Sequence, residues 1–126
     1  MASNMRFELT KREKLRKNRD FQNIYSNGIS VANKLLVLHL LQVEKSENRV
    51  GFAAGRRLGT AVIRNRVKRL LRESYRHYKD ALPKGYDCVL VGRNPAVHRG
   101  LLEIGQAFQK LCIKAEQITD SKSKTL

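Results

Sequence analysis

The stretch that decides the fold is GTAVIRNRVKRLLRESYRHY, residues 59–78. At 100° per residue its apolar side chains fall on one stripe of a helix that begins at Thr60 or Ala61. The stripe comprises Ile63, Val67, Leu70, Leu71, Ser74 and Tyr78. Because an apolar stripe must be buried against another layer, the sequence predicts that residues 60–78 form a helix packed on a sheet.

The basic residues of this predicted helix gather on its other side. Opposite to the stripe lie Asn65, Lys68, Arg69, Arg72 and Arg76, with Arg64 and Arg66 at its edges. Between Gly59 and Tyr78, Glu73 is the only acid, whereas an ordinary solvated helix intersperses acids among its bases. Like charges at i, i+4 cost roughly 0.2–0.5 kcal/mol per pair. Since bound phosphates would relieve this repulsion, we interpret the basic side as a phosphate-binding face.

The charge of the whole chain indicates the same kind of partner. Its 126 residues, 41% of them hydrophobic, suffice for one domain with a single core. A formal net charge of +15, from 26 Lys and Arg against 11 Asp and Glu, indicates a polyanionic partner. No apolar run approaches the roughly 18 residues of a membrane span, and the N-terminus has no apolar run of a signal peptide, so we expect a cytoplasmic protein and no membrane partner.

The segments before the basic helix predict one helix and two strands. RDFQNIYSNG, residues 19–28, is predicted as a helix that Asn18 caps and Gly28 ends. Residues 30–44 are predicted as one central strand, because they are apolar on both faces around Leu36 to Leu41. Residues 49–54, RVGFAA, are predicted to form a second strand that pairs with the first as a hairpin.

The segments after the basic helix predict a third strand and a last helix. CVLVGR, residues 88–93, is typical of a buried strand, and residues 100–118 have the 3.6-residue apolar period of a helix. We expect a basic extension at 1–17, one domain at 18–118 and a disordered tail at 119–126. The order α-β-β-α-β-α predicts an α+β fold, a two-layer sandwich of helices on a sheet.

Residue types that carry out catalysis are scattered along the chain. Its carboxylates form no DxD motif, the ExxE spacing of Glu44 and Glu47 lies in the turn EKSEN, and no motif brings together His39, His77 and His98. Cys88 and Cys112 lie in apolar contexts without CxxC spacing, which predicts buried free thiols. We therefore expect no active site and no metal site formed by the protein.

Three motifs in order resemble the protein subunit of bacterial ribonuclease P. GRRLGTAVIRNRVKRLLRESYR at 55–76, with its central RNR, is similar to the signature of that family. Upstream, KLRKNRDFQNIYSNGISVANKLLVLH at 14–39 resembles the family's N-terminal half, and GRNPAV at 92–97 follows the third strand as it does in the family. The resemblance extends from about Lys14 to Leu111.

This resemblance implies a protein that assists a large catalytic RNA in cutting the 5′ leader from precursor tRNA. The partners would be the catalytic RNA and precursor tRNA, and Mg²⁺ would be held mainly by the RNA, with no organic cofactor. The family's fold is an α-β-β-α-β-α, ribosomal-protein-like sandwich. Its crossover from the second to the third strand is left-handed, against the general rule of right-handed connections.

The resemblance also assigns two sets of residues. The family's RNA-facing signature corresponds to Arg56, Arg57, Arg64, Asn65, Arg66, Lys68, Arg69 and Arg72. The family's cleft for the single-stranded leader, between the first helix and the sheet, corresponds to Phe21, Tyr25, Val37 and His39. Aromatic side chains can stack on unpaired bases while basic residues follow their phosphates. His39 departs from the family, where a tyrosine is more frequent.

Other interpretations of the same residues remain open. Phe21 and Tyr25 are also placed as core residues would be. A non-enzymatic RNA chaperone or ribosome-associated RNA-binding protein would need the same charge, but not the leader cleft. DNA binding is less favoured, because no helix-turn-helix spacing precedes the basic helix.

Overall fold

The computed structural model of the protein describes residue 9 and residues 11–124. This part of the chain contains three α-helices, which are α2 (Asn18–Asn27), α3 (Ala61–Tyr78) and α4 (Leu101–Lys124). Its sheet consists of β1 (Ile29–Ala32), β2 (Leu36–Gln42), β3 (Arg49–Ala54) and β4 (Tyr86–Gly92). Short 3₁₀ turns are η1 (Lys11–Glu13), η2 (Arg56–Leu58), η3 (Lys79–Ala81) and η4 (Asn94–His98).

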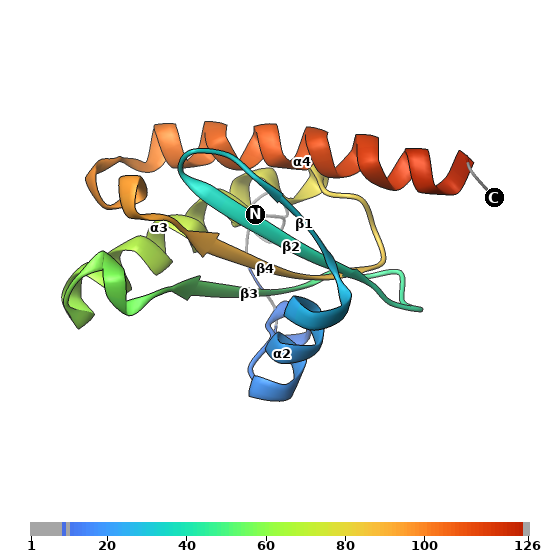
Figure 1. Ribbon diagram of the computed structural model, residues 1–126, viewed down its shortest axis with the longest axis horizontal. Helices are drawn as coiled ribbons and strands as arrows, with labels where there is room; N and C mark the ends of the chain where they lie inside the picture. Colours follow the sequence, from blue (N-terminus) through green and yellow to red (C-terminus); the bar gives the residue numbers. More distant parts are fainter. Residues whose placement is uncertain (1–8, 10, 125–126) are drawn as a thin grey trace, which may run out of the picture.

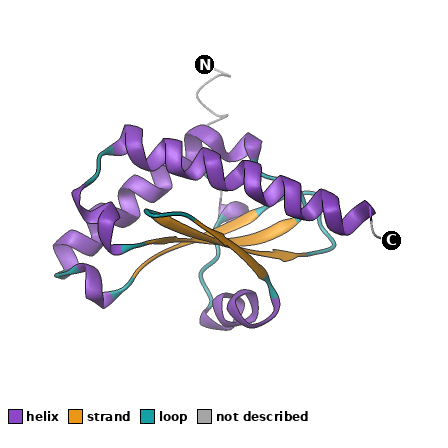
Figure 2. Cartoon of the chain, turned by 45° about the horizontal axis from the view of Figure 1, so that its top comes forward, coloured by secondary structure: helices purple, strands orange, loops and turns teal. Residues whose placement is uncertain are grey.

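The helices cover the two faces of the sheet unequally. α3 and α4 lie together on one face, and the short α2 lies on the other (Figures 1 and 2). The main core fills the α3–α4 side, where Leu36, Leu38 and Leu40 of β2 are fully buried. A smaller core under α2 is centred on Leu15, Ile24 and Val89. The arrangement confirms the predicted α+β sandwich of helices on a sheet.

The segment predicted as one strand, residues 30–44, folds as a hairpin of β1 and β2. The chain turns at Asn33, whose Oδ1 accepts hydrogen bonds from the backbone N–H groups of Leu35 and Leu36. Its Nδ2 donates to the carbonyl of Ala107 in α4. An asparagine side chain that replaces backbone partners favours a turn over a continuous strand. The sheet therefore gains an edge strand, while β2 remains interior as predicted.

The predicted hairpin between residues 30–44 and 49–54 is wrong. The strand order is β1-β2-β4-β3, so β4 lies between β2 and β3. β4 takes this place because Cys88, Val89 and Leu90 are fully buried and need cover on both faces. β3 pairs with β4 in parallel, and the chain connects them through α3. This crossover is left-handed, with α3 behind the sheet in Figure 1, as the family resemblance implied.

Helix boundaries follow the local signals with two differences. α3 begins at Ala61, within the predicted start, and the Oγ1 of Thr60 caps it by accepting a hydrogen bond from the N–H of Ile63. α2 begins at Asn18, but Lys17 occupies the capping position without a side-chain bond, so Asn18 is not the cap. Gly28 ends α2 in an extended conformation, where a Cβ would lie 2.4 Å from the Leu40 carbonyl oxygen. A close approach of two backbones, rather than a left-handed turn, requires this glycine.

The chain ends differ from the predicted extension and tail. Leu15 is buried, and Lys14 forms a parallel bridge with Val50 at the edge of β3, so the segment before α2 belongs to the domain. α4 continues through Lys124, so residues 119–124 are helical rather than disordered. Residues 1–8, 10 and 125–126 of the predicted extension and tail lie outside the described residues.

The buried side of α3 differs from the predicted stripe, because Ile63, Leu70 and Tyr78 are only partly buried. Val67, Leu71 and Ser74 are buried as expected. Tyr75, which the helical wheel left outside the stripe, is only 1% exposed, and its ring lies between those of Phe52 and Phe108. The two cysteines are free and buried as predicted, and burial raises the pKa of the Cys112 thiol to about 12. Within residues 9 and 11–124, no helix is both long and apolar enough to cross a membrane.

Candidate RNA-binding surfaces

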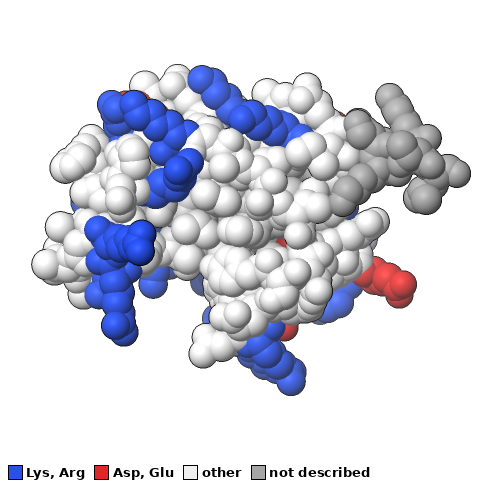
Figure 3. All heavy atoms as spheres, viewed as in Figure 1, with Lys and Arg blue, Asp and Glu red and all other residues white. Residues whose placement is uncertain are grey.

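The predicted RNA-facing residues lie on α3 and on the turn η2 that precedes it. Arg56 and Arg57 in η2 are exposed, as are Asn65, Arg66, Arg69 and Arg72 on α3. Arg64 and Lys68 are partly buried. We call these eight residues the basic face. Figure 3 shows the lysines and arginines that gather on one side of the molecule near η2.

Members of the basic face differ in how far they are held by the protein. The guanidinium of Arg66 donates to the carbonyls of Val97 (2.9 Å) and Arg99 (3.2 Å) at the end of η4. Arg72 lies over the ring of Phe52, with 5.8 Å from its Cζ to the ring centroid. Arg69 is exposed, and the described residues offer it no ion pair. Arg66 therefore has a structural role that the sequence did not reveal, whereas Arg69 is available to a ligand.

The four predicted leader-cleft residues all lie on the α2 side of the sheet. Val37 and His39 alternate with the buried leucines of β2. They pair with Val91 and Val89 of β4, and these two valines belong to the small core under α2. Tyr25 of α2 is 39% exposed, and its ring meets that of His39 edge to face, with 4.8 Å between centroids. The structure therefore brings Tyr25 and His39, two of the predicted cleft residues, into contact.

Phe21 and Tyr25 differ in burial, which bears on whether each is a core residue or a residue that contacts the leader. Phe21 is partly buried, and it packs in the small core with Leu41 and Ala53. Ile24, between them, is the fully buried anchor of α2. Tyr25 remains accessible to a ligand, whereas Phe21 is both a core residue and a lining residue.

The Tyr25–His39 pair is uncharged near neutral pH. Burial lowers the pKa of the His39 imidazole below 6.5 and raises the pKa of the Tyr25 hydroxyl above 10.0. Both rings can thus stack on a base or form neutral hydrogen bonds, and neither contributes a charge.

One hollow joins the α2 side to the basic face. It has a volume of about 400 Å³ and is lined by Leu15, Arg16, Asn18, Phe21, Phe52, Ala53, Ala54, Gly55 and Lys68. Lys68 comes from α3 and Phe21 from α2, so the two predicted surfaces meet at the β3 edge. Arg16, Asn18 and Phe52 line this hollow but were not among the predicted site residues. The position of Arg16 and Asn18 in KLRKNRDF, directly before α2, could have indicated them.

A family model and curated relatives match most of the chain. The family model described as Ribonuclease P matches residues 9–116, which include both surfaces. The chain belongs to the ribonuclease P protein family. A ribonuclease P protein component from Alkaliphilus oremlandii is 43% identical over 108 residues, which cover 86% of this chain and 95% of that protein.

Solved structures of ribonuclease P proteins have the same fold. The Staphylococcus aureus RNase P protein superposes with a TM-score of 0.73 at 33% identity, over 82% of this chain and 94% of that one. The protein from Thermotoga maritima gives a TM-score of 0.73 at 30% identity, over 79% of this chain and 94% of that one. The chain is thus the protein subunit of a ribonuclease P, a component of an endoribonuclease that processes tRNA.

Proposed function

We propose that this subunit, in the cytoplasm, binds the catalytic RNA through the basic face and the 5′ leader of precursor tRNA through Phe21, Tyr25, Val37 and His39. The subunit places the leader beside the catalytic RNA, and the RNA cuts the bond that releases the mature tRNA 5′ end. The hollow shared by Phe21 and Lys68 is the observation that carries this proposal. Because it joins the two surfaces, one bound strand can pass from one surface to the other.

The chemistry of the site supports catalysis by the RNA. Residues 9 and 11–124 bring together no three His, Cys, Asp or Glu side chains able to hold a metal ion. The residues that line the hollow are basic, amide or apolar, which suits phosphates and bases rather than a divalent cation. We therefore propose that the essential Mg²⁺ is held mainly by RNA phosphates, and that the protein contributes binding and position.

The leader assignment is tested by removing the accessible ring. Tyr25→Ala should weaken binding of a long-leader precursor tRNA to the holoenzyme, because stacking is worth about 1–3 kcal/mol per base. Tyr25→Phe, which keeps the ring, should bind as wild type does. The loss should disappear when the leader is trimmed to a single nucleotide, because nothing then reaches the α2 side.

The same experiment separates a leader-binding subunit from an RNA chaperone. Affinity of Tyr25→Ala for the catalytic RNA alone should stay near that of wild type. If a folded Tyr25→Ala protein binds long-leader and trimmed precursors as wild type does, the leader assignment is wrong. A general loss of affinity for unrelated RNAs would instead favour a chaperone.

A further inference from the structure

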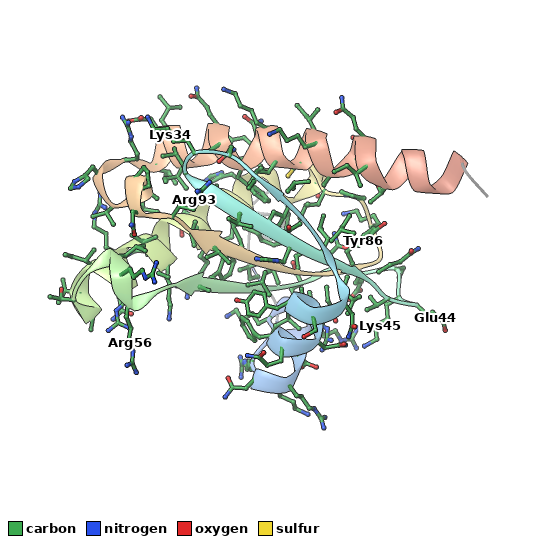
Figure 4. All side chains as sticks on the ribbon, viewed as in Figure 1. Lys34, Glu44, Lys45, Arg56, Tyr86 and Arg93 are labelled. Atoms are coloured by element: carbon green, nitrogen blue, oxygen red, sulfur yellow. The ribbon has the colours of Figure 1, made fainter. Side chains whose placement is uncertain are left out.

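One end of the sheet carries basic residues that the two surfaces above do not include. Leu36 of β2 and Ala54 of β3 both pair with Gly92 of β4, so the segments next to these residues emerge at the same end. Lys34 precedes β2 and Arg93 follows β4, while Arg56 follows β3. Figure 4 shows Lys34 and Arg93 at this end, where the turn from β1 to β2 lies. The end of the sheet is thus continuous with the start of the basic face.

The turn that presents Lys34 is fixed by α4 and by the residue that follows β4. Nη1 of Arg93 donates to the Asn33 carbonyl at 2.7 Å, and Nζ of Lys114 donates to the Ala32 carbonyl at 3.1 Å. The side chain of Asn33 is bonded to Ala107. A turn held by α4 and by the end of β4 presents its lysine in a defined position, at a lower entropic cost of binding than a mobile loop.

A hollow lies beside this turn, against α4. It has a volume of about 310 Å³ and is lined by Asn33, Lys34, Leu35, Arg99, Glu103, Gln106, Ala107 and Lys110. Its single acid, Glu103, already pairs with Arg99 at 3.1 Å. Lys34 and Lys110 are exposed and form no ion pair with a described residue. The hollow is therefore electropositive and suited to phosphate.

We infer that Lys34, Arg93, Arg99 and Lys110, here named the sheet-end surface, bind a second stretch of the catalytic RNA's phosphodiester backbone. The continuity with Arg56 favours the catalytic RNA over precursor tRNA. The hollow lies on the α4 side of the sheet, whereas the leader residues lie on the α2 side. The inference rests on the proposed role of the basic face, which it extends across the end of the sheet.

Charge reversal at single lysines tests the surface. Lys34→Glu and Lys110→Glu should each lower the affinity of the protein for the catalytic RNA about three- to tenfold. The slope of log K for this binding against log[salt] should become shallower by about 1, as for one lost phosphate contact. Lys84→Glu is the matched control, because it changes the charge equally at the opposite end of β4. If Lys84→Glu lowers affinity as much as the other two variants, the effect is one of net charge and the inference is wrong.

A cleavage probe identifies the RNA that lies at this surface. Cys88 and Cys112 are buried, so an iron–EDTA reagent would attach to the new thiol of Lys34→Cys. In the holoenzyme with precursor tRNA, the radicals it generates should cut the catalytic RNA, while the same probe on Lys84→Cys should not cut at those sites. Cuts confined to precursor tRNA, or no cuts, would overturn the inference.

Arg69→Ala distinguishes failure of this inference from failure of the proposed function. If Arg69→Ala weakens assembly and the two lysine variants do not, only the sheet-end surface is wrong. If none of the three variants weakens assembly, the basic face is wrong as well.

Discussion

The ring of Phe21 occupies the space that a side chain on Gly51 would need. A Cβ on residue 51 would lie 2.3 Å from Cζ and 2.6 Å from Cε1 of Phe21. The glycine in RVGFAA therefore lets α2 approach the sheet closely at β3. Because Phe21 also lines the hollow that reaches Lys68, this contact links the position of α2 to the proposed path of the leader.

Gly51→Ala should displace the ring of Phe21 and loosen α2. Overpacking of this kind typically costs about 1–3 kcal/mol. We expect a lower thermal midpoint together with weaker binding of long-leader precursor tRNA, measured on the same preparation. Gly55→Ala is the control for stability, because no atom lies within 4 Å of a Cβ built there. Wild-type stability of a folded Gly51→Ala protein would contradict the close contact.

Arg66→Ala and Arg69→Ala should have different effects although the two residues lie on the same helix. Arg66 donates two hydrogen bonds to carbonyls at the end of η4. Its loss should lower the free energy of unfolding by about 1–2 kcal/mol as well as RNA affinity. Arg69→Ala should weaken RNA binding by about 1–3 kcal/mol without a change in thermal midpoint. Calorimetry measures the stability of each variant, and RNA titration measures its affinity. If both variants are equally stable, Arg66 has no structural role.

Affinity for the catalytic RNA should fall steeply with salt, because each neutralised phosphate releases condensed counterions. If about five to ten phosphates are bound, log K against log[salt] should have a slope of roughly −4 to −9. Titrations at several salt concentrations measure this slope. A slope near zero would contradict an electrostatic interface on a chain with a net charge of +15.

His39 should make stability depend on pH below neutrality. Burial lowers the pKa of His39 in the folded protein below the value of 6.5, so the unfolded chain binds the proton more readily. The contribution of the neutral imidazole to the free energy of unfolding is fully present above about pH 6.5. It is lost as the pH falls through the lower pKa of His39 in the folded state. His39→Tyr should therefore lose less thermal stability than wild type between about pH 7 and about pH 5. Parallel losses in both proteins would assign the dependence to other groups.

Local patterns predicted the elements whose partners are close in sequence. The bounds of α3 were predicted within one residue, because the apolar period and the Thr60 cap act within the helix. β3 was predicted at Arg49–Ala54 for a similar reason, since polar turn residues bound a short apolar run on both sides. Alternation along β2 likewise places Val37 and His39 on one face, opposite to the buried Leu36, Leu38 and Leu40.

By itself, the sequence determined the α+β class, the basic face of α3 and the family, because these depend on periodicity, charge and ordered motifs. Only the tertiary structure decided which strand lies between β2 and β3, and that Asn33 divides residues 30–44 into two strands. The contact of Asn33 with Ala107 joins residues 74 positions apart. Tyr75 was missed for a related reason, because its burial requires both Phe52 and Phe108. Contacts between distant segments leave no period in the local sequence, so they are defined only when the sheet and its helices pack together.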